Sequence, residues 1–231
     1  MTGKQRAGER AADFVRDGMV VGLGTGSTVY WTIRRLGEFV RRGLRIQAIP
    51  TSRRTETLAS EEGIPLTSFA VVDELDLTID GADEVNPNLA LIKGAGGALL
   101  REKLVAAASR KLVIVVDNSK LVPILGRFPL SVEVVPFAWE VTARRVAAVG
   151  CIPSLRRVDD EPFCSDNGNY ILDCPFQAIT DPEALHQTLK LLPGVVETGL
   201  FVGMTDAVVV GSDNSDGVDL LTSDEPDGKA T

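Results

Sequence analysis

Strand-sized apolar runs alternate with helical segments through the first half of this 231-residue chain. The apolar runs lie at residues 20–23, 44–50, 64–69, 75–80, 89–92 and 111–117. Segments with helical spacing of apolar residues separate most of these runs, and they lie at residues 4–17, 27–42, 52–63 and 97–110. Because strands that alternate with helices pair in parallel through right-handed crossovers, this pattern predicts an α/β fold built on a parallel sheet.

The alternation changes near the middle of the chain. Strand and helix patterns then follow in the order βαββαβ, at residues 130–136, 138–150, 152–158, 168–174, 181–192 and 195–201. This order is typical of a ferredoxin-like unit. We therefore expect a Rossmann-like parallel-sheet domain at residues 1–129, completed by residues 201–231, and a smaller inserted ferredoxin-like α/β domain at residues 130–200. The apolar runs at 206–212 and 218–221 are expected to return to the first sheet.

Composition and charge argue against several classes of partner. Hydrophobic residues make up 44% of the chain, which is ordinary for a protein with a buried core. The formal net charge of −8 argues against nucleic acid as the main partner, because phosphate backbones are bound by basic surfaces. No apolar run is long enough to cross a membrane or to form a signal peptide. Cys151, Cys164 and Cys174 lack CxxC and zinc-ligand spacing, so we expect reduced thiols in a cytoplasmic, metal-free protein.

A glycine-rich turn, VVGLGTGSTVYWTI, joins the first apolar run to the next helical segment. It is not a P-loop, because no Gly-Lys pair follows. It also fits the dinucleotide fingerprint poorly, since Ser27 stands in place of the third glycine and residues 46–51 contain no acid. Backbone N–H groups of Thr25 to Thr28 at a helix start would suit a monophosphate. A tight turn capped by Ser27 explains the same residues equally well.

Three acidic residues stand at the end of the apolar run that reads TIDGADE. Asp80 lies at the carboxyl end of the predicted strand, which is the edge at which open parallel sheets bind ligands. Asp83 and Glu84 follow in the loop, and Glu84 is expected to be exposed. An Asx-type turn with solvated acids is the alternative for the two aspartates. Magnesium held by all three acids is a further alternative, although we expect no metal.

Acid–base chemistry in this chain falls to carboxylates and lysines. The single histidine, His186, is expected at the surface or in packing, so no Ser-His-Asp or Cys-His arrangement is available. Lys93 precedes a glycine cluster, from which its amine could reach a site. Glu102 lies among leucines on a predicted helix, and a partly desolvated glutamate has a raised pKa and can act as a general base. Each of these two residues, and Lys120 after a later strand, could instead be exposed.

Several motifs occur in a fixed order along the chain, and they read GLGTGST, TSRRTE, DGADE, KGAGGALLREK, NSK, FPLSVEVVPFA, DNGNYILDC and PGVVETGLF. In this order they resemble the type A ribose-5-phosphate isomerase family, from the first helix to about Leu221. The resemblance implies a Rossmann-like domain with a smaller inserted ferredoxin-like domain. It implies a cofactor-free interconversion of D-ribose 5-phosphate and D-ribulose 5-phosphate through an enediolate, in the pentose phosphate pathway of the cytoplasm. A homodimer or homotetramer is also implied.

The resemblance also implies roles for individual residues. Glu102 would be the base that moves a proton between C1 and C2, and Lys93 would stabilise the negative oxygen of the enediolate. Asp80 and Asp83 would bind sugar hydroxyls, help to open the ring and shuttle hydroxyl protons. The other residues that would contact the substrate are Thr25, Gly26, Ser27, Thr28, Gly81, Ala82, Gly94, Ala95, Gly96 and Lys120.

Two other functions fit parts of the sequence. A related sugar-phosphate isomerase or deaminase could share the fold, although the position of His186 disfavours designs that use a histidine. A sugar-phosphate sensor without activity would keep the glycine loop but would not need Glu102 and Lys93 together. Such a sensor would normally carry a helix-turn-helix, and the sequence has neither that segment nor a basic face.

Overall fold

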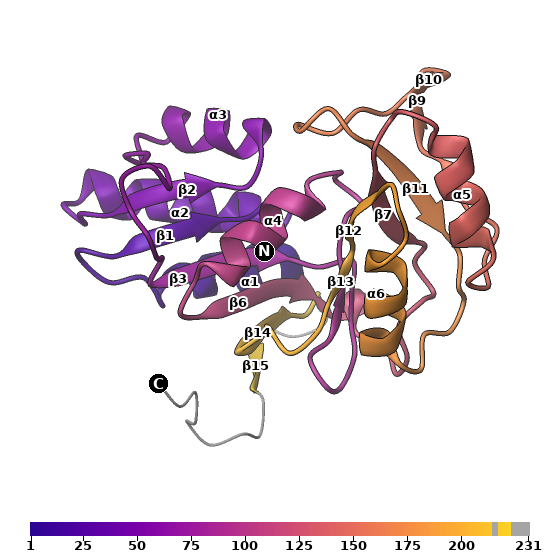
Figure 1. Ribbon diagram of the computed structural model, residues 1–231. Coiled ribbons are helices and arrows are strands. Elements are labelled where there is room, and N and C mark those ends of the chain that lie inside the picture. The colour runs from indigo at the N-terminus through magenta and orange to yellow at the C-terminus, as the bar shows by residue number, and fades with distance from the viewer. Residues whose placement is uncertain (214–216, 223–231) are drawn as a thin grey trace.

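A six-stranded, mostly parallel sheet forms the centre of the larger part of the molecule, as Figure 1 shows. The computed structural model describes residues 1–213 and 217–222. The sheet has the order β15-β14-β6-β3-β1-β2, and only the β14–β15 pair is antiparallel. Its strands are β1 (Val20–Leu23), β2 (Gln47–Pro50), β3 (Leu77–Gly81), β6 (Leu112–Asp117), β14 (Ala207–Gly211) and β15 (Val218–Thr222). The expected parallel sheet is confirmed, and so is the return of the last two strands to it.

Helices cover both faces of this sheet, and they are α1 (Gly3–Ala12), α2 (Val29–Arg41), α3 (Arg53–Glu61) and α4 (Leu99–Ala107). Alternate residues of β6 point to opposite faces, as the strand period of two requires. Val113 and Val115 pack in the cluster that contains the apolar residues of α1 and α2. Ile114 and Val116 pack with Ala106 of α4, which lies on the near face of the sheet in Figure 1. The apolar run at 111–117 is therefore continuous because both faces of its strand are buried.

Two elements of the larger sheet region differ from the sequence prediction. The first helix ends at Ala12 rather than near residue 17, because Phe14 N donates to Ala11 O and Val15 N to Ala12 O in tighter turns. The run at 64–69 makes a single parallel bridge, Ala48 with Leu66, instead of a strand. This run lies beyond β2 at the edge of the sheet, where one neighbour only is available.

A second, four-stranded sheet lies at the right of Figure 1, with the order β12-β7-β11-β8 and antiparallel neighbours throughout. Its strands and helices, in chain order, are β7 (Leu130–Val134), α5 (Trp139–Ala147), β8 (Ser154–Leu155), β11 (Tyr170–Cys174), α6 (Pro182–Lys190) and β12 (Val195–Thr198). These elements follow the βαββαβ order of the sequence pattern. We propose that residues 130–200 are a smaller domain inserted into the first, which residues 1–129 and 201–222 make up; residues 214–216 and 223–231 of the expected first domain lie outside the described residues.

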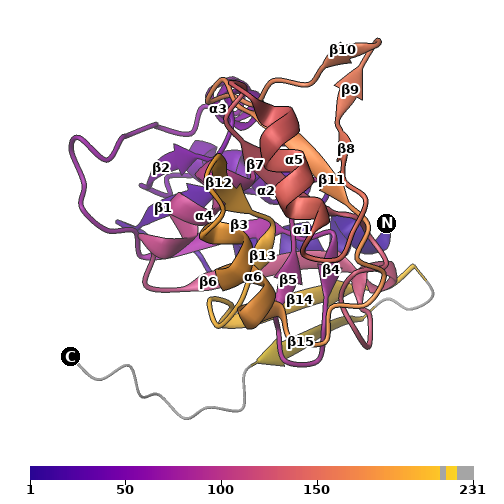
Figure 2. The same ribbon diagram turned by 45° about the vertical axis from the view of Figure 1, so that its right-hand side comes forward.

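Two strands expected in the smaller domain are interrupted. The run at 152–158 breaks after β8, and β9 (Arg157–Val158) pairs instead with β10 (Glu161–Pro162) in a hairpin that projects from the molecule in Figure 2. The run at 195–201 breaks at Gly199, after which β13 (Leu200–Phe201) joins a three-stranded sheet. The other two strands of that sheet are β4 (Glu84–Val85) and β5 (Leu91–Ile92).

Gly199 brings the smaller sheet against the chain that follows β5. Its N–H donates to Ser131 O at 2.7 Å, and its carbonyl oxygen accepts from Lys93 N at 2.8 Å. A Cβ at this position would lie 2.1 Å from Lys93 O, so only glycine fits. The backbone of Lys93 is thus bonded directly to the smaller sheet. Within the described residues, no helix is long and apolar enough to span a membrane.

Candidate active site

A cavity of about 200 Å³ opens where strands β1 and β3 and the turn after β6 reach the same edge of the parallel sheet. Its lining residues are Lys4, Thr25, Gly26, Ser27, Thr28, Gly81, Ala82, Asp83, Lys93, Gly94, Ala95, Gly96, Glu102 and Lys120. Every residue that the sequence analysis placed at the site lines it, except Asp80. Asp80 is 1% exposed and lies beneath the cavity wall, beside Lys93. The carboxyl edge of the sheet therefore gathers the predicted residues in one place.

The glycines of the first turn serve distinct structural purposes. A Cβ on Gly22 would lie 2.0 Å from Thr78 Oγ1, and a Cβ on Gly24 would lie 2.0 Å from Asp80 Oδ1. These two glycines allow β1 and its turn to approach β3 closely. Gly26 has a φ of +142°, which disfavours any other residue. The turn is thus built around the carboxylate of Asp80, whose Oδ1 accepts hydrogen bonds from Thr25 N at 3.1 Å and Gly81 N at 2.7 Å.

The start of helix α2 offers unpaired backbone donors to the cavity. The amides of Gly26, Ser27 and Thr28 donate to no residue in the described part of the chain. The helix is capped at Thr28 rather than Ser27, and the Thr28 hydroxyl makes no capping hydrogen bond. Free N–H groups at the positive end of a helix bind anions. The capping explanation of this turn is therefore wrong for Ser27, and its donors remain available to a ligand.

Two lysines complete this end of the cavity. Lys120 ends the short 3₁₀ turn η1 (Asn118–Lys120), which Asp117 caps by accepting from Ser119 N at 2.9 Å. Lys4 comes from the first turn of α1, and the sequence analysis missed it. The segment around Lys4 carries no motif, and its place at the cavity depends on how α1 packs across β6 and β14. Two cations and three free amides make this end of the cavity a suitable seat for a phosphate group.

Elsewhere in the cavity wall, Lys93 stands between two buried carboxylates. Its Nζ lies 3.1 Å from Asp80 Oδ2 and 3.3 Å from Glu102 Oε2, and it donates to Gly81 O at 2.5 Å. The side chains of Asp80, Lys93 and Glu102 are each at most 5% exposed. Asp80 Oδ2 and Glu102 Oε2 accept no hydrogen bond from any described residue, in spite of the nearby ammonium group. Both carboxylates therefore keep unused lone pairs in a site with little water.

This arrangement raises the affinity of the carboxylates for protons. Burial and the charge of Asp80 raise the pKa of Glu102 to about 8, against the opposing attraction of Lys93. Burial also raises the pKa of Asp80, although Lys93 and two backbone N–H groups oppose the shift. For Lys93, burial alone would lower the pKa, but the two carboxylates outweigh it and the pKa is raised. One cation thus faces two coupled carboxylates, and both have a raised pKa.

Asp83 and Glu84 turn in different directions. Asp83 lines the cavity, and its Oδ2 accepts from Ala95 N at 2.9 Å, so it is tied to the glycine-rich turn after Lys93. Glu84 is 1% exposed, so the expectation of an exposed side chain is wrong. Its carboxylate accepts from Gly126 N at 2.7 Å and Phe128 N at 2.6 Å, away from the cavity. The three acids therefore do not converge as a magnesium site would require, and the described residues contain no cluster of metal-ligand type.

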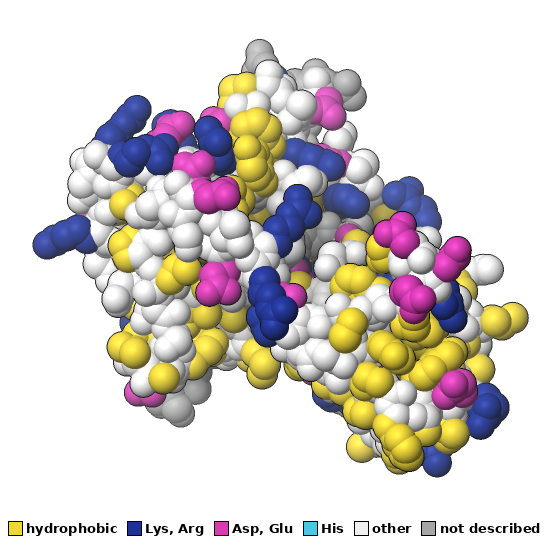
Figure 3. Space-filling model, turned by 90° about the horizontal axis from the view of Figure 1, so that it is seen from above, with side chains coloured by type: hydrophobic (Ala, Val, Ile, Leu, Met, Phe, Trp, Pro, Cys, Tyr) yellow, Lys and Arg dark blue, Asp and Glu magenta, His cyan; other side chains and the backbone are white. Residues whose placement is uncertain are grey.

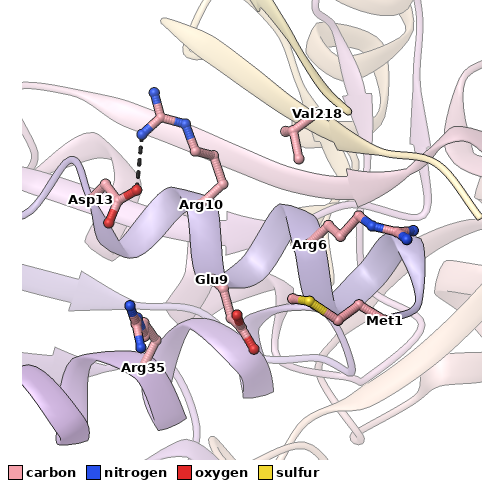
Figure 4. A pocket seen from close by; sticks show the side chains of 7 residues that line it. All are labelled: Met1, Arg6, Glu9, Arg10, Asp13, Arg35 and Val218. Carbon is pink, nitrogen blue, oxygen red and sulfur yellow. Dashed lines mark hydrogen bonds and ion pairs between the residues drawn. The ribbon is translucent and has the colours of Figure 1, made fainter. Parts of the chain in front are cut away.

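Other polar features have structural explanations. His186 is partly buried and its Nδ1 lies 2.7 Å from Thr198 Oγ1, which agrees with the packing role expected for it. The three cysteines are free thiols, as expected. A larger hollow of about 510 Å³ lies beside α1, and Figure 4 shows its lining side chains. Its arginines already have partners, since Arg10 pairs with Asp13 at 2.9 Å and Arg35 with Glu38 at 2.6 Å.

Comparison with known proteins supports the resemblance noted in the sequence. The model of the family described as ribose 5-phosphate isomerase A (phosphoriboisomerase A) matches residues 47–215. A ribose-5-phosphate isomerase A of Bacillus mycoides is 57% identical over 212 residues, which cover 91% of this chain and 96% of that protein. The chain belongs to the ribose 5-phosphate isomerase A family. Another ribose-5-phosphate isomerase A, from Parvibaculum lavamentivorans, is 50% identical over 225 residues, covering 94% of this chain and 96% of its own.

Solved structures agree with this family in fold. A D-ribose-5-phosphate isomerase in complex with phospho-erythronic acid superposes with a TM-score of 0.91 at 40% identity, covering 95% of this chain and 97% of its own. The ribose 5-phosphate isomerase A of Methanocaldococcus jannaschii gives a TM-score of 0.89 at 41% identity, with the same coverage. The Rossmann-like fold class expected from the sequence is thereby confirmed. Isomerisation of ribose 5-phosphate is the reaction for which the geometry of the cavity has to account.

Proposed function

We propose that the cavity interconverts D-ribose 5-phosphate and D-ribulose 5-phosphate, with Glu102 as the base that moves a proton between C2 and C1. The observation that carries this proposal is the buried carboxylate of Glu102 in the cavity wall, with an oxygen that accepts no hydrogen bond from the described residues. A general base works best when its pKa lies near the operating pH. The pKa of about 8 for Glu102 meets that condition, whereas an exposed glutamate would be too weak a base.

The proton transfer follows from the position of Glu102 beside Lys93. Glu102 takes the proton from C2 of the open-chain aldose, and the electron pair of the C–H bond moves toward the carbonyl oxygen at C1. The resulting enediolate is negative at that oxygen, and the buried ammonium of Lys93 stabilises this charge where water cannot screen it. The hydroxyl proton at C2 passes to the negative oxygen at C1, and return of the first proton from Glu102 to C1 gives the ketose. No oxidant or reductant is consumed.

Asp80 and Asp83 hold the rest of the reacting end. Asp80 keeps Lys93 charged and fixes the turn at Thr25 through its other carboxylate oxygen. Asp83 lines the cavity and is oriented by Ala95 N, so one carboxylate oxygen remains to accept from a sugar hydroxyl. We assign ring opening and hydroxyl proton exchange to Asp83, and Asp80, which lies beneath the cavity wall, acts through Lys93. The backbones of Gly81, Ala82, Gly94, Ala95 and Gly96 form the wall around the sugar.

The phosphate is assigned to the opposite end of the cavity. The amides of Gly26, Ser27 and Thr28 supply hydrogen-bond donors, and Lys4 and Lys120 supply positive charge. A solved structure similar to this chain holds phospho-erythronic acid, and a phosphorylated sugar acid supports a sugar phosphate as the substrate class. An anion seat that holds the phosphate would orient the sugar for one proton transfer.

We also propose a cytoplasmic homodimer or homotetramer. Hydrophobic side chains gather at the lower right of Figure 3, over the side of the molecule that the smaller domain forms. In that domain Phe137 is 89% exposed, Ile152 85% and Leu191 83%. Contiguous exposed apolar surface in a soluble protein typically marks an association site. Light scattering on the purified protein would give the mass of the assembly, and a mass of one chain at micromolar concentration would contradict the proposal.

The activity is tested with the purified, EDTA-treated protein in D₂O. Ribose 5-phosphate is added, and NMR follows the formation of ribulose 5-phosphate and the exchange of hydrogen at C2. Isomer formation with incorporation of deuterium is the expected result for an enediolate that forms without a metal. Binding of the substrate without product or exchange would instead favour a sensor or a different sugar phosphate.

A further inference from the structure

Arg156 of the smaller domain reaches across to the glycine-rich turn of the cavity. It lies between β8 and β9, at the point where the expected strand is interrupted. Its Nη1 donates to Gly94 O at 2.7 Å and to Ala95 O at 3.1 Å. Both acceptors belong to residues that line the cavity, whereas Arg156 itself does not line it. Because the strand is interrupted here, the guanidinium group contacts the glycine-rich loop at residues 94–97, which is called the loop below.

The guanidinium group is held rigidly from its own domain. Nε donates to Asp173 Oδ2 at 3.1 Å, and Nη2 donates to Asp173 Oδ1 at 2.5 Å and to Ser131 Oγ at 2.8 Å. The Arg156 side chain is only 14% exposed. With the two carbonyl oxygens of the loop, these contacts engage all five N–H donors that an arginine carries. No donor remains for a substrate, so Arg156 acts on the reaction through the loop.

The two carbonyl contacts fix the orientation of two successive peptide groups. In a trans peptide the N–H points away from the C=O, and no cis peptide occurs in the described chain. The carbonyl of Gly94 faces Arg156, and the N–H of the same peptide, at Ala95, donates to Asp83 Oδ2. The carbonyl of Ala95 also faces Arg156, and its partner N–H, at Gly96, donates to no described residue. The Gly96 N–H is therefore an unused donor on the side of the loop away from Arg156.

We propose that Arg156 is a positioning residue that holds this loop, so that the Gly96 amide is directed at an oxygen of the substrate and Asp83 is held in its working orientation. The inference rests on the isomerase activity proposed above. Gly94 has a φ of +116° and Gly97 a φ of +74°, so the glycines leave the conformation of the loop dependent on its hydrogen bonds. One of these bonds is internal, from Gly97 N to Gly94 O at 2.9 Å, and Arg156 adds two more from the smaller domain. A donor that is already oriented needs no rearrangement during the reaction, and it stabilises developing negative charge most strongly in a buried site.

The decisive variant is Arg156→Lys, which keeps the charge but loses the planar five-donor fork. Its control is Arg157→Lys, because the adjacent Arg157 is exposed and donates only to Asp160 O at 2.5 Å among the described residues. We expect Arg156→Lys to lower kcat/KM for ribose 5-phosphate by roughly 10- to 100-fold, since small misplacements of positioning groups have effects of that size. Arg157→Lys should stay within about twofold of the parent protein.

A second measurement separates positioning from general loss of structure. Inorganic phosphate is used as a competitive inhibitor, because it probes the seat at the start of α2 and Arg156 contacts none of that seat. The inference predicts an unchanged inhibition constant for Arg156→Lys together with the reduced kcat/KM. Wild-type rates in Arg156→Lys would overturn the inference. If phosphate inhibition, kcat/KM and the melting temperature all fell together, the inference would be overturned as well. Arg156 would then only stabilise the fold. An inactive parent protein would refute the proposed isomerase itself, independently of Arg156.

Discussion

Two groups of charged side chains, one buried and one partly buried, flank the ring of Phe201, and they have opposite electrostatic characters. The two-acid cluster consists of Asp80, Lys93 and Glu102, and its Lys93 Nζ lies 5.5 Å from the ring centroid. It has one cation for two carboxylates, and two carboxylate oxygens accept no hydrogen bond from the described residues. As a result the pKa of Glu102 is raised to about 8, chiefly by burial.

The two-lysine cluster consists of Lys103, Lys190 and Glu197, and its Lys103 Nζ lies 4.9 Å from the same ring. Glu197 accepts from Lys103 at 2.8 Å and from Lys190 at 3.1 Å, and Thr198 N donates to it at 2.8 Å. Burial alone would raise the pKa of Glu197, but the two lysines and the backbone bond outweigh it and the pKa is lowered. Burial of a glutamate therefore does not by itself make a base.

The difference lies in the ratio of cations to carboxylates and in the satisfaction of the carboxylate oxygens. Glu102 and Lys103 are neighbours on α4, and the rotation of about 100° between successive helical residues directs them to different clusters. The surroundings of Glu102 raise its pKa and favour its protonated form, whereas the surroundings of Glu197 lower its pKa and favour its ionised form. This contrast predicts that equivalent changes in the two clusters have different consequences.

The largest expected difference is in catalysis. Glu102→Gln should lower kcat by about 10³-fold with KM for ribose 5-phosphate largely kept, because a general base contributes roughly 10²- to 10⁴-fold. Glu197→Gln, the same change in the two-lysine cluster, should leave kcat within about threefold. Steady-state kinetics of the two variants checks this. Normal turnover by Glu102→Gln would remove Glu102 from the mechanism.

The next difference is in stability. Glu197→Gln should lower the free energy of unfolding at pH 7 by about 1–3 kcal/mol, because two lysines lose their charged partner. A lowered pKa means that this stabilisation is present above the unfolded value of 4.5 and is lost as the pH falls through the folded value. Urea unfolding at pH 7 and at pH 3.5 checks the sign. An equal loss at both pH values would show that charge is not the cause.

The pH dependence of the reaction should follow Glu102. Because the base must be deprotonated, kcat/KM is expected to rise with pH, by up to tenfold per unit, and to level off above about pH 8. Glu197→Gln should show the same profile as the parent protein. A profile that levels off near pH 5 would mean that an ordinary carboxylate, and not the buried Glu102, is the group that titrates.

Sequence order located most of the site, because strands that lead to one edge of a parallel sheet bring distant motifs together. Asp80 and Lys93 could be predicted in this way from their places after apolar runs. The burial of Glu84 could not, since the amides that it binds belong to residues more than 40 positions further along the chain. Lys4 was missed because a lysine in the first turn of a helix ordinarily faces solvent. Arg156 was missed because it lies at an interruption of a strand.

The smallest expected effect is a gain in stability. A raised pKa means that the folded protein binds an extra proton between pH 4.5 and about 8, so Glu102 lowers stability progressively as the pH rises through that window. Glu102→Gln removes this penalty and should be more stable than the parent by about 1 kcal/mol at pH 8 but not at pH 4.5. Thermal unfolding at the two pH values checks this. A stability loss at pH 8 would mean that the ion pair with Lys93 outweighs the cost of burying the charged glutamate.

The backbone contacts of Gly199 with Ser131 and Lys93 also limit how the smaller domain can be exchanged with that of a relative. The chain enters the smaller sheet beside Ser131 and leaves it beside Gly199. Both residues take part in the backbone hydrogen bonds that link the smaller sheet to Lys93. A smaller domain transplanted from a relative must therefore bring Ser131, Arg156, Asp173 and Gly199 as one set. Exchange of the domain at the obvious loop positions without that set would give a folded chimaera with a misaligned active site.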